Sequence, residues 1–303
     1  MRPALGTLRL LIMSGALLLA AGCAAPQRGF VFDVAADMRE FAPPQHPGPA
    51  YFSGVCDALR TLGPGAFMVS PGDVDPPDRI QATLNEAFGA GYTWYPVVGN
   101  HEGEQPQTLV YLRALNAGGR KLPRVVRAGP PGAVETCYAF DYQNAHFVVL
   151  NEYYDGKSDM ATDGDVSDPL YQWLAEDLAA NRQPIIFVFG HEPTVAVPDM
   201  DNGLVRHRGD SLDAHAANNH RFWSLLREHK VAAFICGHTH CTSLAKINGV
   251  WQVDSGHARG LGDEGAASTF LKVCVLPAGV RCDIYRMIDK DGRYALKHSA
   301  WLN

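Results

Sequence analysis

Two histidines one residue apart, His238 and His240, are the side chains in this sequence most suited to chemistry. They follow the apolar run 231–236 and a glycine, Gly237. The run predicts a buried strand, and the glycine lets the chain leave extended geometry, so both imidazoles can turn toward one point beyond the sheet. Neutral imidazole is the commonest protein ligand for transition metals. The pattern therefore indicates part of a metal site, which needs further ligands.

Four more loops that follow predicted strands carry side chains of the same kind. These residues are Asp37, Asp73, Asn100 with His101, and His191. Ligands of open α/β sheets bind beyond the carboxyl ends of the strands, so we expect the five loops to converge. Each residue alone has an ordinary alternative, because Gly-Asp and Gly-Asn are common turn formers and a lone histidine suits a loop. The five together indicate a metal centre.

An alternation of strands and helices must position these loops. Strands are expected at 30–36, 66–70, 93–98, 136–142, 146–151, 185–190 and 231–236, with shorter ones at 242–247, 250–254, 270–276, 280–287 and 294–297. Helices are expected at 51–62, 77–88, 107–116, from the N-cap Asp168 onward, and over 220–229. The alternation in the first half predicts parallel β-α-β units. No linker divides the chain, so one two-sheet α/β domain over residues 29–303 is expected.

Composition places the chain among ordinary globular proteins. Of its 303 residues 47% are hydrophobic and 19% are charged, which allows a large core. The net charge of -6 gives no sign of a nucleic-acid partner held by bulk electrostatics.

The N-terminus has the pattern of a targeting segment. Arg2 and Arg9 precede the apolar run 10–21, which is too short to span a bilayer and ends in Leu-Ala-Ala-Gly-Cys at Cys23. This resembles a bacterial lipoprotein signal, which implies an acylated Cys23 and export to the periplasmic face of the outer membrane. The alternative is an ordinary secretory signal cleaved near Ala25. The expected segments are a signal peptide at 1–22 and a tether at 23–28.

Export makes disulfides possible, and two cysteines are candidates. Cys274 and Cys282 lie symmetrically in an expected hairpin over 270–287, so they can face each other across it. The alternative is that both are small buried residues that never pair. Cys236 and Cys241 flank the histidine pair and are interpreted as packing residues.

The order of these motifs resembles the calcineurin-like metallophosphoesterase superfamily. The motifs are Asp37, Gly-Asp73, Gly-Asn100-His101-Glu102, Val-Phe-Gly-His191 and Gly-His238-Thr-His240. The resemblance covers residues 29–275 and implies an α/β/β/α sandwich and a metal-dependent phosphoesterase, with a small or macromolecular phosphoester as its partner. It does not imply which phosphate ester is the substrate.

The resemblance also implies a role for each motif residue. Asp73 would bridge two metals, Asn100, His191 and His238 would complete the second, and Asp37 and His240 would hold the first. His101 would face the leaving group, oriented by Glu102 or Asp75. The mixed donors suit Mn, Fe or Zn rather than Ca. Two such cations neutralise phosphate oxygens and acidify a water, and His101 supplies the proton for the leaving alkoxide.

One position departs from the family pattern. Where the family usually has a histidine, two residues after Asp37, this chain has Arg39, which is not a metal ligand. This departure allows three explanations. Water or substrate takes the place of the missing ligand, Arg39 binds a phosphate oxygen, or the first metal is weakly bound or absent. We favour an active enzyme in which Arg39 clamps phosphate. The alternatives are a salt bridge from Arg39 to Glu40 or Asp75, and a surface binding module that keeps one metal and binds a phosphate-bearing ligand without hydrolysis.

The segment 192–213 has almost no periodic apolar signal, and structureless loops of this length are usually functional. Its Arg206 and His207 are candidates to contact an anionic substrate, and the alternative is a solvated charge run. His257, which follows a strand on the same side as the histidine pair, is a weaker candidate for the missing ligand.

Overall fold

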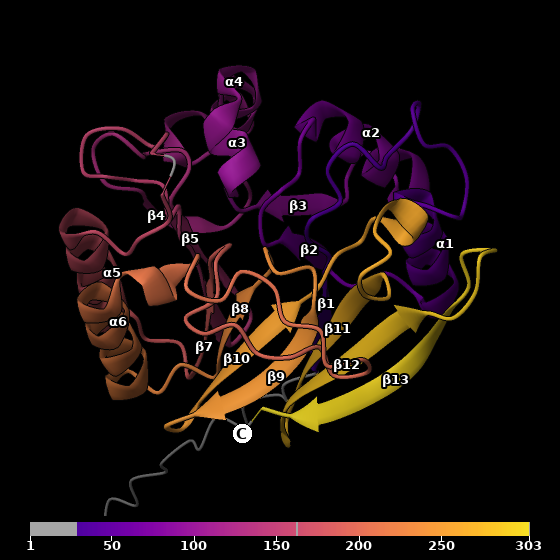
Figure 1. Ribbon diagram of the computed structural model, residues 1–303. Helices are drawn as coiled ribbons and strands as arrows, with labels where there is room; N and C mark the ends of the chain where they lie inside the picture. Colours follow the sequence, from indigo (N-terminus) through magenta and orange to yellow (C-terminus); the bar gives the residue numbers. More distant parts are fainter. Residues whose placement is uncertain (1–28, 162, 303) are drawn as a thin grey trace, which may run out of the picture.

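The computed structural model describes residues 29–161 and 163–302. They form two mixed β-sheets packed face to face, with helices on both outer faces, so the expected two-sheet α/β sandwich is confirmed (Figure 1). Sheet A contains, from edge to edge, β13 (Tyr294–Trp301), β12 (Gly279–Met287), β11 (Thr269–Leu276), β1 (Phe30–Val34), β2 (Phe67–Ser70) and β3 (Thr93–Pro96). Sheet B contains β4 (Val125–Ala128), β5 (Tyr138–Tyr142), β6 (Ala145–Val149), β7 (Ile185–Phe189), β8 (Ala233–Cys236), β10 (Val250–Ser255) and β9 (Thr242–Ile247).

The helices cover the two outer faces of this sandwich. They are α1 (Phe52–Leu62), α2 (Pro77–Phe88), α3 (Asn100–Glu104), α4 (Pro106–Leu115), α5 (Asp168–Ala180) and α6 (Ala216–Glu228). Residues of α1, α2 and α4 share one core with sheet A, and residues of α5 and α6 share another with sheet B. None of the helices in the described ranges has the length and hydropathy to cross a membrane. The predicted signal peptide and Cys23 lie outside the described residues.

An aromatic core joins the two sheets. Phe32 of β1 stacks on Phe67 of β2 with ring centroids 5.5 Å apart, and it meets Phe147 of β6 edge-on at 5.2 Å. The central strands are buried on both faces, which explains why they are continuous apolar runs rather than alternating ones.

Several local expectations are corrected. Helix α5 begins at Asp168 with Ser167 as its N-cap, one residue earlier than expected. Strand β4 and helix α3 were not expected, because β4 is a four-residue, partly exposed edge strand and α3 has only five residues, too few to show a period.

The proposed pairing of Cys274 with Cys282 is wrong. In the β11–β12 ladder Cys282 lies opposite Val273, and Cys274 lies opposite Arg281. The two cysteines are therefore one register position apart, and their side chains point to opposite faces of the sheet. All six described cysteines are free and buried, as expected for Cys236 and Cys241.

His146 at the start of β6 connects α5 to sheet B. Its Nδ1 lies 2.7 Å from Asp141 and its Nε2 lies 2.8 Å from Asp177 of α5. Burial lowers the pKa of His146, but the hydrogen bonds and charges of Asp177 and Asp141 outweigh burial, so the net pKa is raised.

We expect His146→Gln to lower the free energy of unfolding by about 2–3 kcal/mol at acidic pH, because a charge-assisted pair is lost. A raised folded pKa means that this contribution is complete below the unfolded pKa and is lost as pH rises through the folded pKa. In denaturant titrations the gap between wild type and variant should therefore shrink with rising pH. The matched variant His298→Gln, which breaks a half-exposed pair with Asp201, should change little. A gap that stays constant with pH would contradict a charged His146.

Candidate metal centre

The carboxyl ends of parallel strands from both sheets meet at one edge of the molecule. β1, β2 and β3 are parallel in sheet A, and β6, β7 and β8 are parallel in sheet B. The loops after these strands carry the metal-ligand candidates: Asp37 after β1, Asp73 after β2, Asn100 after β3, His191 after β7, and His238 and His240 after β8. The structure brings all six together in two groups.

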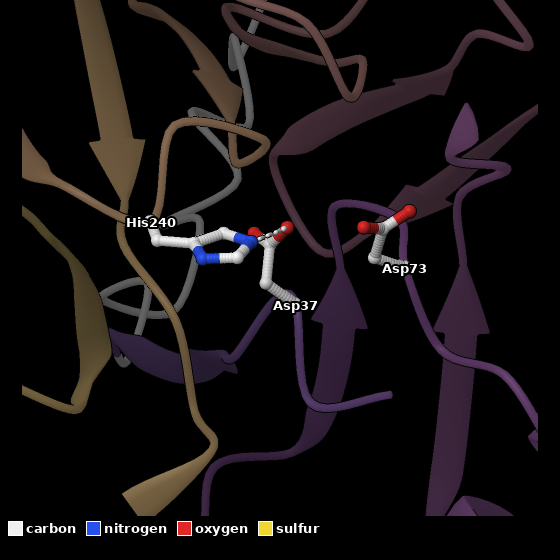
Figure 2. A group of neighbouring side chains, drawn as sticks. All are labelled: Asp37, Asp73 and His240. Atoms are coloured by element: carbon white, nitrogen blue, oxygen red, sulfur yellow. Dashed lines mark ion pairs between the residues drawn. The ribbon is translucent and has the colours of Figure 1, made fainter. Parts of the chain in front are cut away.

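Asp37, Asp73 and His240 form the first group, in which one ligand atom of each lies within 4.8 Å of the others. Figure 2 shows His240 and Asp37 facing each other, with Asp73 beyond them. Oδ2 of Asp37 accepts the backbone N–H of His238 at 3.0 Å. Its Oδ1 is buried, has no hydrogen-bond partner among the described residues, and lies 3.5 Å from Nε2 of His240. A buried carboxylate oxygen without a donor is costly unless a cation meets it, so this group fits a metal ion.

His191 lies at the centre of the second group. Its Nε2 is 3.1 Å from Oδ1 of Asn100, 3.2 Å from Nδ1 of His238 and 3.4 Å from Oδ1 of Asp73. Three further potential ligand atoms therefore lie within 3.4 Å of Nε2 of His191. Asp73 belongs to both groups, so the residues present suit two ions that share a carboxylate.

Each of the three histidines has its second ring nitrogen against a fixed acceptor. The acceptors are the carbonyl of Pro71 for His191 at 2.8 Å, the carbonyl of Asp210 for His238 at 3.3 Å, and Oδ2 of Asp263 for His240 at 2.5 Å. For His191 and His238, an N–H donated there leaves the other nitrogen unprotonated and facing the group. Nδ1 of His240 also lies 2.9 Å from Nη1 of Arg206, which donates to the same Asp263 carboxylate. Burial lowers the pKa of each ring to about 3, so all three are neutral at physiological pH.

The two carboxylates of the first group, in contrast to the histidines, have raised pKa values. Burial and the charge of Asp73 raise the pKa of Asp37 well above its usual range, and burial raises that of Asp73. Two ionised carboxylates cannot stay buried this close together without a countercharge. The buried Arg259 supplies part of that charge and a bound cation would supply the rest, which is a second reason why the residues fit a metal.

Four of the ligand candidates have positive φ angles, which residues other than glycine rarely adopt. Their φ angles are 54° for Asp37, 54° for Asp73, 69° for His238 and 58° for His240. Non-glycine residues in this left-handed region are costly and gather at functional sites. At Asp37 the carbonyl is fixed by a 2.6 Å hydrogen bond from Nε of the buried Arg259.

Glu102 holds two of the loops together. Its Oε2 accepts the backbone N–H groups of Asp73 at 2.9 Å and Gly99 at 2.6 Å, and its Oε1 accepts that of Val74 at 2.9 Å. Gly99 has to be glycine, because a Cβ there would lie 2.4 Å from Oδ1 of Asp73. Glu102 therefore fixes the position of Asp73.

The expected orientation of His101 by Glu102 or Asp75 is wrong. The nearest carboxylates to the His101 ring are Asp73, at 3.7 Å from Nε2, and Glu104, at 3.4 Å from Nδ1. Asp75 is occupied by Arg39, whose Nε lies 3.1 Å from its Oδ1, and by Gln105. Of the alternatives for Arg39, the structure thus has the salt bridge to Asp75.

The loop 192–213 reaches the metal centre. The ring of His207 lies over that of His238 with centroids 4.1 Å apart, and Nη1 of Arg206 lies 2.9 Å from Oδ2 of Asp263. The base of the loop is fastened to sheet A by Arg286 of β12, which is 1% exposed and binds Asp199 through both Nη atoms at 2.8 and 3.0 Å. This segment is therefore a fixed wall of the centre.

His257 is not positioned to complete the first group. Its Nε2 lies 2.9 Å from the carbonyl of Ala266, and its Nδ1 accepts the backbone N–H of Arg259 at 3.2 Å. Both ring nitrogens are occupied, so the first group has three protein ligands.

Sequence reasoning missed Asp263, Arg259 and the carbonyl of Pro71. Asp263 lies in the short turn Gly-Asp-Glu-Gly, which has no period and no motif. Arg259 stands two residues after His257, but a single arginine gives no sign that it will be buried. A backbone carbonyl leaves no signal at all in the residue types.

Known proteins resemble this chain in sequence and in fold. A family model described as calcineurin-like phosphoesterase matches residues 32–242, more than half of the chain. The search of curated proteins found no match to this chain. Among solved structures, GAP50, described as the anchor in the inner membrane complex of Plasmodium, is similar with a TM-score of 0.58 and 12% identity over 91% of this chain and 89% of that one. PhoD is similar with a TM-score of 0.59 and 14% identity over 91% of this chain and 70% of that one. At such identities these two likenesses show the fold alone.

We expect Asp263→Asn to weaken divalent-metal binding about 10- to 100-fold, because His240 loses the carboxylate that fixes its tautomer. Titration of the metal-free protein with Mn²⁺ against a chelating dye measures this affinity. Glu264→Gln removes the adjacent, exposed carboxylate and should leave the affinity unchanged. Equal affinities in Asp263→Asn and wild type would mean that Asp263 does not support the first group.

Proposed function

Because this chain belongs to the calcineurin-like phosphoesterase family, we propose that it hydrolyses a phosphate ester with metal ions held at the shared edge of its two sheets. The observation that carries the proposal is the position of Asp73, which lies in both donor groups. Asp37, Asp73 and His240 would hold one ion, and Asp73, Asn100, His191 and His238 the other. Carboxylate, amide and imidazole donors together favour Mn, Fe or Zn.

When bound, such ions neutralise phosphate oxygens and acidify a water. The protein supplies the other parts of the reaction. His101 has a side chain that is 27% exposed, beside Asp73, so it can meet a leaving group and give its oxygen a proton. The neutral histidines keep their ligand nitrogens free of protons.

We propose that three side chains around the metal centre bind substrate. Arg39 presents a half-buried guanidinium beside Asp75, and Arg206 and His207 come from the fixed loop 192–213. Guanidinium groups form bidentate hydrogen bonds to phosphate oxygens, which suits a phosphoester substrate.

The place of action that we propose follows from the sequence. An acylated Cys23 would anchor the protein to the outer membrane of a bacterium, with the catalytic domain in the periplasm. This part of the proposal rests on the signal-like segment 1–22 alone.

A binding module is the second candidate function. The observation that favours it is the first group, which has three protein ligands and an arginine where the family usually has a histidine. GAP50, which shares the fold, is described as an anchor. In this case one ion would stay in the second group, and the centre would hold a phosphate-bearing ligand without cleaving it.

We expect the protein to hydrolyse an aryl phosphate when loaded with Mn²⁺, Fe²⁺ or Zn²⁺, and His101→Asn to lower kcat about 100- to 1,000-fold, because the proton donor is lost. The control His220→Asn, an exposed histidine on α6, should keep full activity. If no metal gives turnover above that of a variant lacking both His101 and His191, the hydrolase proposal fails.

We expect two substitutions at Arg39 to separate its roles. Arg39→Gln should raise KM about 10-fold or more with a smaller change in kcat, because a charge-assisted contact to phosphate is lost. Arg39→His should instead tighten binding of the second equivalent of metal, measured by calorimetry. Retention of a single ion by wild type, with phosphate affinity and no turnover in either variant, would favour the binding module.

A further inference from the structure

A hollow of about 660 Å³ lies at the end of the molecule opposite the metal centre. It is bounded by the starts of β7 and β10, the end of α6, the β11–β12 turn and Leu302. Strands β7 and β8 run from this end toward the ligand-bearing loops, so the hollow is separated from the metal centre by the length of the sheet. Figure 1 shows the ends of β9 and β13 in the lower part of the view, away from α3.

The lining of the hollow is amphipathic. Apolar side chains such as Ile185, Val231 and Leu302 contribute to its wall. Two cations, Arg227 and Lys230, are exposed at the end of α6 and just after it, and neither has an ion pair within the described ranges. Glu228 is the one acidic residue of the lining. The hollow therefore suits a ligand that has both an anionic and an apolar part.

The surface beside the hollow carries exposed aromatic and basic side chains. Trp301, the last residue of β13, is 46% exposed and precedes Leu302 in the wall. Near the β9–β10 turn, Nζ of Lys246 lies 5.6 Å from the ring centroid of Trp251. Tryptophan together with lysine and arginine is the combination that proteins place at a membrane–water boundary.

The described chain also begins at this end. Gly29 lies against the end of β11, where a Cβ would be 2.6 Å from the carbonyl oxygen of Val275, and Phe30 pairs with Val275. Cys23 precedes Gly29 by six residues, which span at most about 20 Å. An acyl chain on Cys23 would therefore keep the bilayer within about 20 Å of Gly29, which lies at the same end of the molecule as the hollow.

We propose that this end of the protein docks on an anionic phospholipid surface, with a headgroup phosphate in the hollow between Arg227 and Lys230 and with Trp301 at the lipid boundary. The docked orientation turns the metal centre away from the bilayer, toward soluble substrates. The proposal does not depend on hydrolysis, and the predicted lipid anchor serves only to bring the surface close.

The test uses the chain from Ala24 onward, which contains every described residue and lacks the acylation site. Its binding is measured by co-sedimentation with vesicles of phosphatidylglycerol mixed with phosphatidylcholine, and with vesicles of phosphatidylcholine alone. We expect binding only to the anionic vesicles, and loss of binding at high salt. Arg227→Gln/Lys230→Gln should bind about 25-fold more weakly, since each basic side chain near such a surface contributes about fivefold. Its thermal unfolding should match wild type, because neither side chain makes an ion pair.

The matched control is Arg79→Gln/Lys157→Gln, which removes one charge from the first turn of α2 and one from the loop between β6 and α5, and it should bind like wild type. Trp301→Ser should weaken binding and remove the blue shift of tryptophan fluorescence on vesicles. Equal binding by wild type and Arg227→Gln/Lys230→Gln, or an equal loss in the control pair, would overturn the proposal. If soluble glycerol phosphate binds as tightly as the vesicles do, the hollow is a small-molecule site and the membrane is not its partner.

Discussion

Two carboxylates buried against each other, Asp37 and Asp73, determine how the whole edge of this molecule is built. Both are removed from water, and each raises the free energy of the other's ionised form. The protein surrounds them with three imidazoles that burial keeps neutral, and it leaves one oxygen of Asp37 without a donor. Such an environment is unfavourable for the protein alone and favourable once cations are present, which is the physical basis of a metal centre.

The surrounding fold keeps this unfavourable arrangement in place. The strained backbone persists because buried side chains form hydrogen bonds to the loops that carry it. The strained residues are Asp37, Asp73, His238 and His240. Glu102 collects three backbone N–H groups from the loops after β2 and β3, and Arg259 fixes the carbonyl of Asp37. Arg286 fastens the loop 192–213 to sheet A. Much of the buried charge at this edge therefore serves to position other residues.

The sequence allowed the strands and the residues at their ends to be predicted, because buried parallel strands are unbroken apolar runs and the ligands follow them directly. It did not allow the supporting contacts to be predicted. The contact of Asp263 with His240 depends on which loops meet in three dimensions, and the salt bridge of Arg39 to Asp75 could be named only as one of several alternatives. The error at Cys274 and Cys282 has the same origin, since a symmetric spacing in a hairpin does not fix its register.

Each donor group draws on both layers of the sandwich: Asp37, Asp73 and Asn100 follow strands of sheet A, whereas His191, His238 and His240 follow strands of sheet B. An ion held between them is thus a cross-link across the seam between the sheets. Pulling the layers apart would release it, so occupancy and resistance to unfolding are thermodynamically linked. For a cell, the supply of metal would then govern the lifetime of this protein as well as its chemistry.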